Sequence, residues 1–364
     1  MDSISITKTT TSRINTVDWS NLGFGKFFSD HVFMADYIDG AWKDLRIIPY
    51  GPMPVEPALC TLHYAQSIFE GLKAFHTADG SVNVFRPHMN AKRLNRSAEM
   101  VCIPDFDVDL LVDGIRRLIA VDYDWVPTQR GTSLYIRPVV YGTDNFLGVR
   151  ASETYRLIVM TSPVASYYAE GLNPVRIKVD SAHVRAVRGG LGAAKTAANY
   201  AASIHAGKKA KEEGFAQVLF LDGVSHELVE EVGTMNIMFL IGDELITPTL
   251  EQGSILAGVT RDSVLHVARS WGVNVVERPI TIEEVAGAHA AGTLKEVYGT
   301  GTAAVISPVG ELVYEGRSLK INDGVIGPFA QKMYDTITGI QYGEIEDAFQ
   351  WNVHIPLAEL KTGA

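Results

Sequence analysis

Cysteine is scarce in this chain: the 364 residues include two, Cys60 and Cys102, and no C-x-x-C pair. The sequence therefore lacks the patterns of a zinc ribbon and of a dithiol redox site, and we expect two reduced thiols. The ten histidines show no ligand spacing, and HELVEE, from His226, lacks the second histidine of H-E-x-x-H. We therefore expect no metal site. A G-x-S-x-G nucleophile elbow is absent as well.

Long apolar runs and an excess of positive charge are also missing. No stretch approaches the length of a membrane-spanning helix, and the first residues contain no apolar core of a secretory signal. The formal net charge of -10 argues against nucleic acid or an anionic membrane as a partner. We expect a cytoplasmic protein that binds small molecules, including acidic ones if a pocket is locally basic.

Short apolar strands and amphipathic helices are mixed in both halves of the chain, without regular β–α–β alternation. This mixture favours an α+β (mixed α/β) fold with two domains. Residues 162–174 are rich in Pro, Gly, Ser and Tyr, which is typical of an inter-domain loop. The prediction is a smaller domain over residues 1–161 and a larger one over residues 175–364.

Three local signals predict helices. One face at helical spacing is formed by Leu111, Ile115, Leu118 and Ile119. Thr281 opens T-I-E-E, which fits a capping box, and Pro328 suits the first turn of what we expect to be the last helix. Each signal predicts a helix without predicting what the helix packs against.

A glycine-rich stretch, RGGLGAAKTAANYAAS from Arg188 to Ser203, contains the most informative lysine. It resembles the phosphate-binding loop G-x-x-x-x-G-K-[ST], but Ala194 stands where that loop needs glycine, and the preceding SAHVRAVR is polar. The alternative is an amine nucleophile, because lysine forms Schiff bases with aldehydes such as that of pyridoxal phosphate. Small residues around Lys195 leave room for a ring, and Tyr200 follows closely. A purely structural lysine in a glycine turn is a third alternative.

Three further segments could complete a site of this kind. GVTR, from Gly258, precedes an amphipathic helix, whose first backbone N–H groups would bind a phosphate. GTGTAA, from Gly299, is another turn of small residues, and EVGTMN puts Glu231 just before an apolar strand. Each signal is weak alone. In particular, Glu231 and the adjacent Glu230 could both be surface carboxylates at a strand start.

In this order, the segments resemble the class IV aminotransferases, the pyridoxal phosphate enzymes of fold type IV. The run EVGTMNIMFLIGDELITPTLEQGSILAGVTR is similar to the family signature, with Met238 where Phe or Tyr is usual. Within the class, HYAQSIFEGLKAF, FRPHMNAKRLNRSAEM and LYIRPVVYGTDNFLGV resemble the branched-chain amino acid aminotransferases. The resemblance runs from about Phe24 to the last helix, and it implies a two-domain fold of type IV.

The resemblance implies a role for each matching residue. Lys195 would bind pyridoxal phosphate covalently and be the catalytic residue. The cofactor would also be held by Arg93, Tyr200, Glu231, Val259, Thr260 and Thr302. The substrate would be bound by Phe24, Tyr64, Phe69, Tyr135, Arg137, Thr234 and Ala303, with Leu147 and Val149 covering the pocket of a neighbouring subunit. A homodimer is therefore implied.

The implied reaction is transamination between L-branched-chain amino acids and 2-oxoglutarate, giving 2-oxo acids and L-glutamate. Ala304 and Ser307 stand where mammalian members have a redox C-x-x-C, so no thiol switch is expected there. Two alternatives stay open. One is another class IV activity, namely D-amino acid transamination or aminodeoxychorismate lyase chemistry. The other is a nucleotide-binding module that uses the near-match to the phosphate-binding loop.

Overall fold

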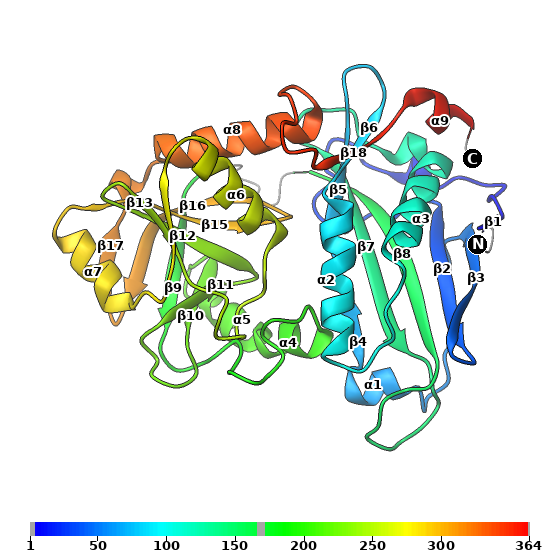
Figure 1. Cartoon of the computed structure of the whole chain (residues 1–364), viewed down its shortest axis with the longest axis horizontal. Coiled ribbons are helices and arrows are strands. Elements are labelled where there is room, and N and C mark those ends of the chain that lie inside the picture. Colours follow the sequence, from blue (N-terminus) through cyan, green and yellow to red (C-terminus); the bar gives the residue numbers. More distant parts are fainter. Residues whose placement is uncertain (1–3, 166–171, 363–364) are drawn as a thin grey trace. The chain divides into compact units, whose positions relative to one another are not determined.

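The computed structural model describes residues 4–165 and 172–362, which divide into two compact units. Unit one contains residues 4–165, 196–198 and 339–362, and unit two contains residues 172–195 and 199–338. The predicted α+β class is confirmed, because both units mix helices with sheet (Figure 1). Each unit has its own buried apolar core.

The predicted domain division differs from these units at three places, one of which is residues 196–198, predicted in the larger domain but part of unit one. Ser162–Val164 continue a strand of unit one, and residues 166–171 of the predicted link lie outside the described residues. Residues 339–362, predicted as part of the larger domain, belong to unit one. They do so because the strand Asn352–Ile355 pairs with Val82–Phe85, far away in the sequence.

Unit one is a sheet with helices along one face. Among the described residues its strands are β1 (Ser5–Ile6), β2 (His31–Ile38), β3 (Ala41–Pro49), β4 (Ser67–Phe69), β5 (Leu72–His76), β6 (Val82–Phe85), β7 (Ser133–Gly142), β8 (Tyr155–Val164) and β18 (Asn352–Ile355). Its helices are α1 (Cys60–Tyr64), α2 (Pro87–Glu99), α3 (Val108–Val121) and α9 (Leu357–Thr362), with short 3-10 turns at Ile14–Thr16 and Tyr123–Trp125. The strand order is β1-β3-β2-β8-β7-β5-β6-β18, and β4 pairs with β7.

The predicted amphipathic helix is α3, which lies with α2 against the sheet (Figure 1). All four residues of the predicted face, Leu111, Ile115, Leu118 and Ile119, are buried, so this prediction is confirmed. The helix begins where Asp107 accepts a hydrogen bond from the N–H of Leu110. A side-chain cap of this type satisfies an N–H group that has no partner within the helix.

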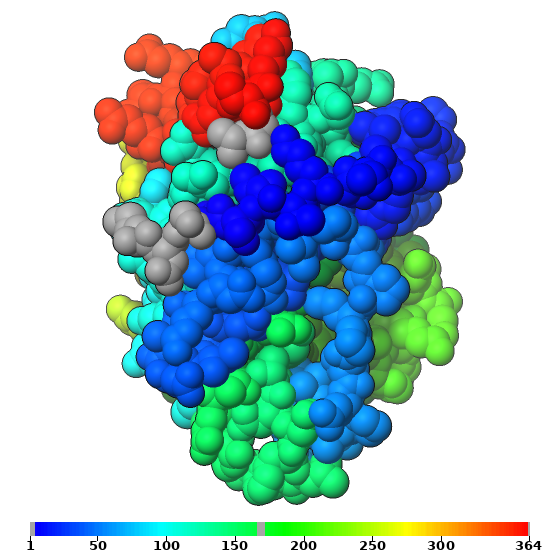
Figure 2. Space-filling model, turned by 90° about the vertical axis from the view of Figure 1, so that its right-hand side faces the viewer, coloured from blue at the N-terminus to red at the C-terminus, as the bar shows by residue number. Residues whose placement is uncertain are grey.

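The N-terminal residues lie across unit one (dark blue in Figure 2). β1 pairs in parallel with β3, and the N–H of Thr9 donates to His31 Nε2 at 2.8 Å. On its other side the imidazole of His31 bonds to Asp122 at 2.6 Å. The segment therefore covers the edge of β3 that would otherwise be open to another strand.

A close contact inside unit one gives a stability prediction. Gly114 lies in α3, and a Cβ there would stand 2.5 Å from a ring carbon of the buried Phe33. Gly→Ala in an open helix stabilises by about 1 kcal/mol, but overpacking a core costs about 1–3 kcal/mol. Gly114→Ala should therefore lower the free energy of unfolding by about 1 kcal/mol, measured by urea denaturation. Gly207→Ala is the matched control, because its Cβ would meet no atom within 4 Å. Equal stabilisation by both changes would contradict this packing argument.

Unit two contains a closed barrel. Its strands, among the described residues, are β9 (Val175–Asp180), β10 (Gln217–Leu221), β11 (Val229–Val232), β12 (Met235–Ile241), β13 (Glu244–Thr247), β14 (Asn274–Glu277), β15 (Leu294–Gly301), β16 (Val305–Tyr314) and β17 (Arg317–Lys320). The strand order is β11-β10-β9-β16-β15-β12-β13-β14, and an additional β11–β12 pairing joins the two ends of the six-strand run from β11 to β12. The apolar side chains of Ile177, Leu219, Ile237 and Leu312 belong to its core.

Helices of unit two connect and flank these strands. They are α5 (Ile204–Glu212), α6 (Val259–Ser270) and α7 (Ile282–Ala290), with a short turn at Asn322–Gly324; α4 (Ala197–Ala202) and α8 (Pro328–Tyr342) have residues in both units. The capping prediction is confirmed, since the Thr281 side chain accepts from the N–H of Glu284 at the start of α7. The expectation that the helix at Pro328 is the last one is wrong, because α9 follows it.

Candidate active site

Lys195 ends the glycine-rich loop of unit two, and a phenol is among its polar partners. Its Nζ donates to the hydroxyl of Tyr200 at 2.5 Å and lies 4.5 Å from the centre of that ring. The short helix α4 places Tyr200 five residues after the lysine. β9 ends at Asp180, well before Gly189, so the strand does not lead straight into the loop as a phosphate-binding loop requires. The local geometry favours a lysine paired with a phenol over a nucleotide loop.

Both carboxylates at β11 are buried. Glu230 and Glu231 are each 3% exposed, so the alternative that they are surface carboxylates is wrong. Glu231 Oε1 accepts the N–H of Leu256 at 2.6 Å and lies 3.3 Å from Arg185 Nη2. Glu230 accepts from the hydroxyl of Ser254, and burial raises the pKa of its carboxyl. The two adjacent residues therefore have different partners, as the alternation of a strand requires.

Sheet pairing brings the predicted turns of unit two to one edge of the barrel. Glu231 pairs with Asn236 across β11 and β12, and Asn236 pairs with Thr300 across β12 and β15. Thr234 follows β11 directly, and the turn with Thr302 and Ala303 follows β15. Because β11 and β15 both run antiparallel to β12, these two turns lie at the same edge.

The start of α6 is tied to that edge as well. The Asn236 amide donates to the carbonyl of Leu256 at 2.9 Å, and the Leu256 N–H donates to Glu231. Two residues later Gly258 caps α6, without a side chain that could bond the first-turn N–H groups. Val259 and Thr260, both buried, form that first turn. A helix start of this kind is suited to an anion such as a phosphate.

Three of the predicted residues, Tyr200, Glu231 and Thr234, line one small cavity of unit two. Its wall is completed by Arg185, Asn199, Ser203 and Gly233. Arg185 and Asn199 were not predicted as site residues. Two partners of Arg185, at positions 231 and 254, lie far along the chain, so no local pattern points to Arg185. Asn199 lies within the glycine-rich stretch, directly before Tyr200, and that position is the signal that could have found it.

In unit one, Arg93 of α2 is buried and held in a fixed orientation. Its Nε and Nη2 donate to the carboxylate of Glu70 at 2.7 and 2.9 Å, and Asn90 donates to the same carboxylate at 2.8 Å. Two parallel hydrogen bonds of this type fix the plane of a guanidinium. The role of Arg93 toward a phosphate stays a prediction.

Unit one also contains an apolar cavity of about 380 Å³. Four of the predicted pocket residues line it, namely Phe24, Phe69, Tyr135 and Arg137. Arg137 lies 4.8 Å from the centre of the Phe69 ring and donates to the Tyr135 hydroxyl at 2.9 Å. The cavity thus combines aromatic walls with one guanidinium, so both an apolar side chain and a carboxylate have a chemically matching surface in it.

Other residues of this cavity were not predicted. They include Phe28, Val139, Met160 and Ser162. Val139 could have been found, because it follows Arg137 by two positions on β7 and therefore shares its face. Met160 could not, because it stands opposite Arg137 only through the β7–β8 pairing.

The remaining predicted residues of unit one lie at its surface. Tyr64, on α1, is half-exposed and is not part of the wall of the apolar cavity. Leu147 and Val149 lie in the loop between β7 and β8 and are 66% and 89% exposed. Exposed apolar side chains at a loop tip are compatible with a partner surface, and their predicted role stays a prediction.

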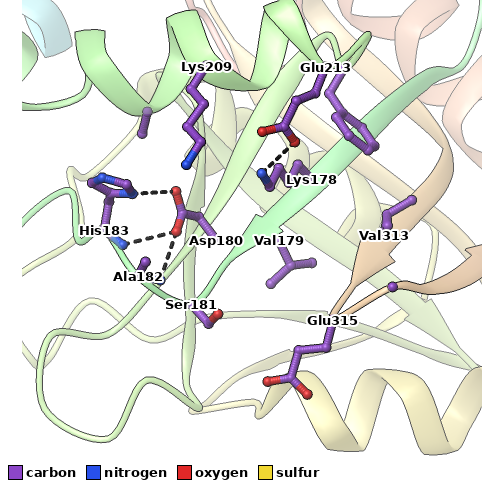
Figure 3. Close-up of a pocket in the computed structure, with 13 residues that line it drawn as sticks. Lys178, Val179, Asp180, Ser181, Ala182, His183, Lys209, Glu213, Val313 and Glu315 are labelled. Carbon is purple, nitrogen blue, oxygen red and sulfur yellow. Dashed lines mark hydrogen bonds and ion pairs between the residues drawn. The ribbon is translucent and has the colours of Figure 1, made fainter.

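A second cavity of unit two, about 360 Å³, contains none of the predicted residues (Figure 3). Lys178 pairs there with Glu213 at 2.6 Å, and His183 bonds to Asp180 at 2.9 Å. These two pairs place opposite charges within the wall, and the other two charged side chains, Lys209 and Glu315, also have opposite signs, so the wall has no cluster of one charge that would select a ligand.

Some kinds of site find no support in residues 4–165 and 172–362. No group of three or more His, Cys, Asp or Glu side chains there is arranged to hold a metal ion. None of the helices in this part is both long enough and apolar enough to cross a membrane. Cys60 and Cys102 are not joined in a disulfide.

Comparison with known proteins places these features in a family. Residues 67–312 match the family described as amino-transferase class IV. The chain is 52% identical over 339 residues to "Branched-chain-amino-acid aminotransferase 2" of Bacillus subtilis (strain 168), and the match covers 93% of each chain.

Two solved structures support the same assignment. The branched-chain aminotransferase of Thermoproteus uzoniensis with norvaline is 26% identical with a TM-score of 0.73, covering 89% of this chain and 100% of that one. The T.th. branched-chain amino acid aminotransferase complexed with N-(5'-phosphopyridoxyl)-L-glutamate is 25% identical with a TM-score of 0.73, covering 89% and 97%. The chain therefore belongs to the class IV aminotransferases and, within them, to the branched-chain amino acid aminotransferases.

Proposed function

We propose that this protein transfers the amino group between the L-branched-chain amino acids leucine, isoleucine and valine and 2-oxoglutarate, with pyridoxal phosphate as cofactor. The observation that carries the proposal is the hydrogen bond of Lys195 to Tyr200, whose phenol shares a cavity wall with Glu231. The ligands of the relatives agree with it, since one structure contains norvaline and the other a phosphopyridoxyl adduct of glutamate.

The residues of unit two are suited to pyridoxal phosphate. An amine, a phenol and a buried carboxylate match the aldehyde, the phenolic oxygen and the pyridine nitrogen of the cofactor. The start of α6, with Val259 and Thr260, matches its phosphate, and Thr302 would contribute a further contact. Arg93 would add a guanidinium to the same phosphate. When bound, the cofactor supplies an electron-withdrawing ring that stabilises negative charge at the substrate Cα.

Proton transfer is the task of Lys195. As a general base, its amine would take the proton from the substrate Cα. As a general acid, it would then deliver that proton to C4′, the carbon of the cofactor's aldehyde group. The phenol of Tyr200 would keep the amine oriented through the bond already present. Glu231 would hold a proton on the pyridine nitrogen, because an opposite charge favours the protonated form. Because the first product would leave before the second substrate binds to the same groups, we expect ping-pong kinetics.

Substrate binding would use groups from both turns and from the apolar cavity. Thr234 and the N–H of Ala303 would bind the α-carboxylate. Phe24, Phe69 and Tyr135 would enclose a branched side chain, and Arg137 would bind the distal carboxylate of glutamate. Tyr64, outside the wall of this cavity, would contribute only at its margin. A homodimer would let Leu147 and Val149 cover the pocket of the partner, which their exposure supports.

A substrate panel tests the proposed function. The purified protein, incubated with pyridoxal phosphate and 2-oxoglutarate, should form glutamate with L-leucine, L-isoleucine and L-valine and not with D-amino acids. Formation of glutamate from D-amino acids alone, or lyase activity on aminodeoxychorismate, would replace this proposal by another class IV activity. Nucleotide binding without a visible cofactor absorbance band would favour the nucleotide-binding alternative.

Arg137 provides a prediction about the two substrate classes. Arg137→Met should raise the KM for glutamate and 2-oxoglutarate far more than the KM for leucine, because only the former have a distal carboxylate. Loss of a charged hydrogen bond costs roughly 1.5–3 kcal/mol, or about 10–150-fold. Steady-state kinetics with both substrates measure it, with Arg130→Met as the control. Arg130 is an exposed arginine paired with Glu344. Equal losses for both substrates would mean that Arg137 has only a structural role.

A further inference from the structure

Arg185 of unit two is a buried arginine without an assigned role. It precedes Lys195 by ten residues, on the same loop, and is 6% exposed. Its Nη2 lies 3.3 Å from Glu231 Oε1 and also donates to the carbonyl of Ser254. A buried guanidinium is costly unless it is paired and hydrogen-bonded, so these contacts account for its position.

The other terminal nitrogen of the Arg185 guanidinium, Nη1, bonds to a residue of α4, the short helix that contains Tyr200. With its amide oxygen turned toward Arg185, Asn199 accepts from Nη1 at 2.9 Å, and its amide nitrogen donates to the Arg185 carbonyl at 3.3 Å. Asn199 directly precedes Tyr200, which is bonded to Lys195. One planar side chain thus connects β11 with α4, the two elements that carry the carboxylate and the phenol.

A glycine makes this close arrangement possible. A Cβ on Gly192 would stand 2.1 Å from the carbonyl oxygen of Ser254. The loop that contains Arg185 therefore packs directly on the segment that contains Ser254 and Leu256. Both Arg185 and the Leu256 N–H then reach Glu231 Oε1.

We propose that Arg185 is a positioning residue for this site: it fixes the Glu231 carboxylate as an anion and holds the Asn199–Tyr200 helix in register with it. The proposal rests on the proposed function, in which Glu231 acts on the pyridine nitrogen. Arg185 itself would not touch the substrate. A lysine could supply the charge at this place but not the planar fork that contacts Glu231, Ser254 and Asn199 at the same time.

The charged groups beside this pair of glutamates include Arg185. Arg185, Glu231 and Asp222 act on the adjacent Glu230, and of these three only Arg185 is a cation. Burial raises the pKa of Asp222, but backbone N–H bonds outweigh this and hold it well below the usual range; they come from Val224, Ser225, Glu227 and Leu228. Glu230 bonds to Ser254, and its other oxygen has no partner among the described residues. The direct contact of Arg185 is with Glu231, which should therefore be the ionised member of the adjacent pair.

The test uses the full-length chain with Arg185→Met, Arg185→Lys and the control Arg188→Met. Arg188 lies three residues further along the same loop, is exposed and bonds to Gln252. Infrared spectra near pH 7, before and after pyridoxal phosphate is added, report whether Glu231 is ionised. The Glu231 signal is assigned by adding Glu231→Gln to each variant. The rate of the leucine half-reaction is measured in parallel.

In wild type and in Arg188→Met, we expect that Glu231→Gln removes a carboxylate band. In Arg185→Met, before pyridoxal phosphate is added, it should remove a protonated carboxyl band, because the buried acid has lost the cation in contact with it. Arg185→Lys should keep the carboxylate band yet slow the half-reaction, by up to about 10²-fold for a misplaced group. An ionised Glu231 in Arg185→Met before pyridoxal phosphate is added would overturn the proposal. If Arg185→Met does not fold, a wild-type half-reaction rate in Arg185→Lys would overturn the positioning role instead.

The experiment distinguishes failure of the proposed function from failure of the positioning role of Arg185. If wild-type protein fails to bind pyridoxal phosphate, the proposed function is wrong, whatever the infrared spectra of the variants show. If wild-type protein binds it and the Glu231 band does not respond to Arg185→Met, only the positioning role of Arg185 is wrong.

Discussion

Replacing Lys195 with alanine is expected to abolish covalent attachment of pyridoxal phosphate and nearly all transamination. In the proposed function, this amine would both form the bond to the cofactor aldehyde and carry the proton. General acid–base catalysis alone contributes about 10²–10⁴-fold, and the lost covalent attachment adds to that. Borohydride reduction followed by mass spectrometry of peptides should find the cofactor on Lys195 in wild-type protein and on no lysine in the variant.

The control for this experiment is Lys209→Ala. Lys209 is an exposed lysine on α5 of the same unit, so its loss should leave attachment and rate unchanged. Free pyridoxal phosphate could still bind to Lys195→Ala through the phosphate contacts, which an equilibrium titration would detect. An adduct on a different lysine, or an active Lys195→Ala enzyme, would show that the hydrogen-bonded pair with Tyr200 is not the cofactor site.

The second large effect is expected for Glu231→Gln. Glutamine keeps the shape and can still accept the Leu256 N–H, but it removes the negative charge that would act on the pyridine nitrogen in the proposed function. The nitrogen should then lose its proton, and cleavage of the substrate Cα–H bond should slow. Removal of one preorganised electrostatic group costs about 10²–10³-fold in rate. The single-turnover rate of the L-leucine half-reaction measures this, with cofactor content checked by absorbance.

Glu230→Gln is the matched control next to it. Burial raises the pKa of Glu230, and glutamine keeps the shape of glutamate and can still accept from the Ser254 hydroxyl. The change should therefore be nearly silent, although Glu230 is buried. A Glu231→Gln rate within a few-fold of wild type would refute the assigned role. So would a large loss in Glu230→Gln with Glu231→Gln intact.

The parts of the fold that sequence patterns predicted are those determined by neighbouring residues. α3 was predicted by the spacing of Leu111, Ile115 and Leu118, and α7 by the cap at Thr281, and both are confirmed. The return of the chain to unit one was not predicted. The pairing of β18 with β6 joins residues about 270 positions apart, and nothing in Asn352–Ile355 itself specifies that partner.

The same holds for the site: residues close together in sequence could be predicted, and residues that meet only in the folded chain could not. Lys195 and Tyr200 are five positions apart, so a short motif contains both. The burial of Glu230 was missed because a polar residue at a strand start is usually exposed, and here Ser254, from a distant loop, covers it. In the sequence, Arg185 is one of several polar residues in its segment, and its partners at positions 199, 231 and 254 come together only in the folded barrel.

The late position of β18 in the chain has a consequence for biosynthesis. Domains generally fold as units while the chain emerges, those nearer the N-terminus first. In unit one, however, the strand that covers β6 is made only after the whole barrel of unit two. Until then, the free edge of β6 is a surface to which another unfinished chain could pair. Unit one is therefore the first to be synthesised but the last to be complete. All residues of unit two have been synthesised before Asn352–Ile355, the last strand of the unit-one sheet.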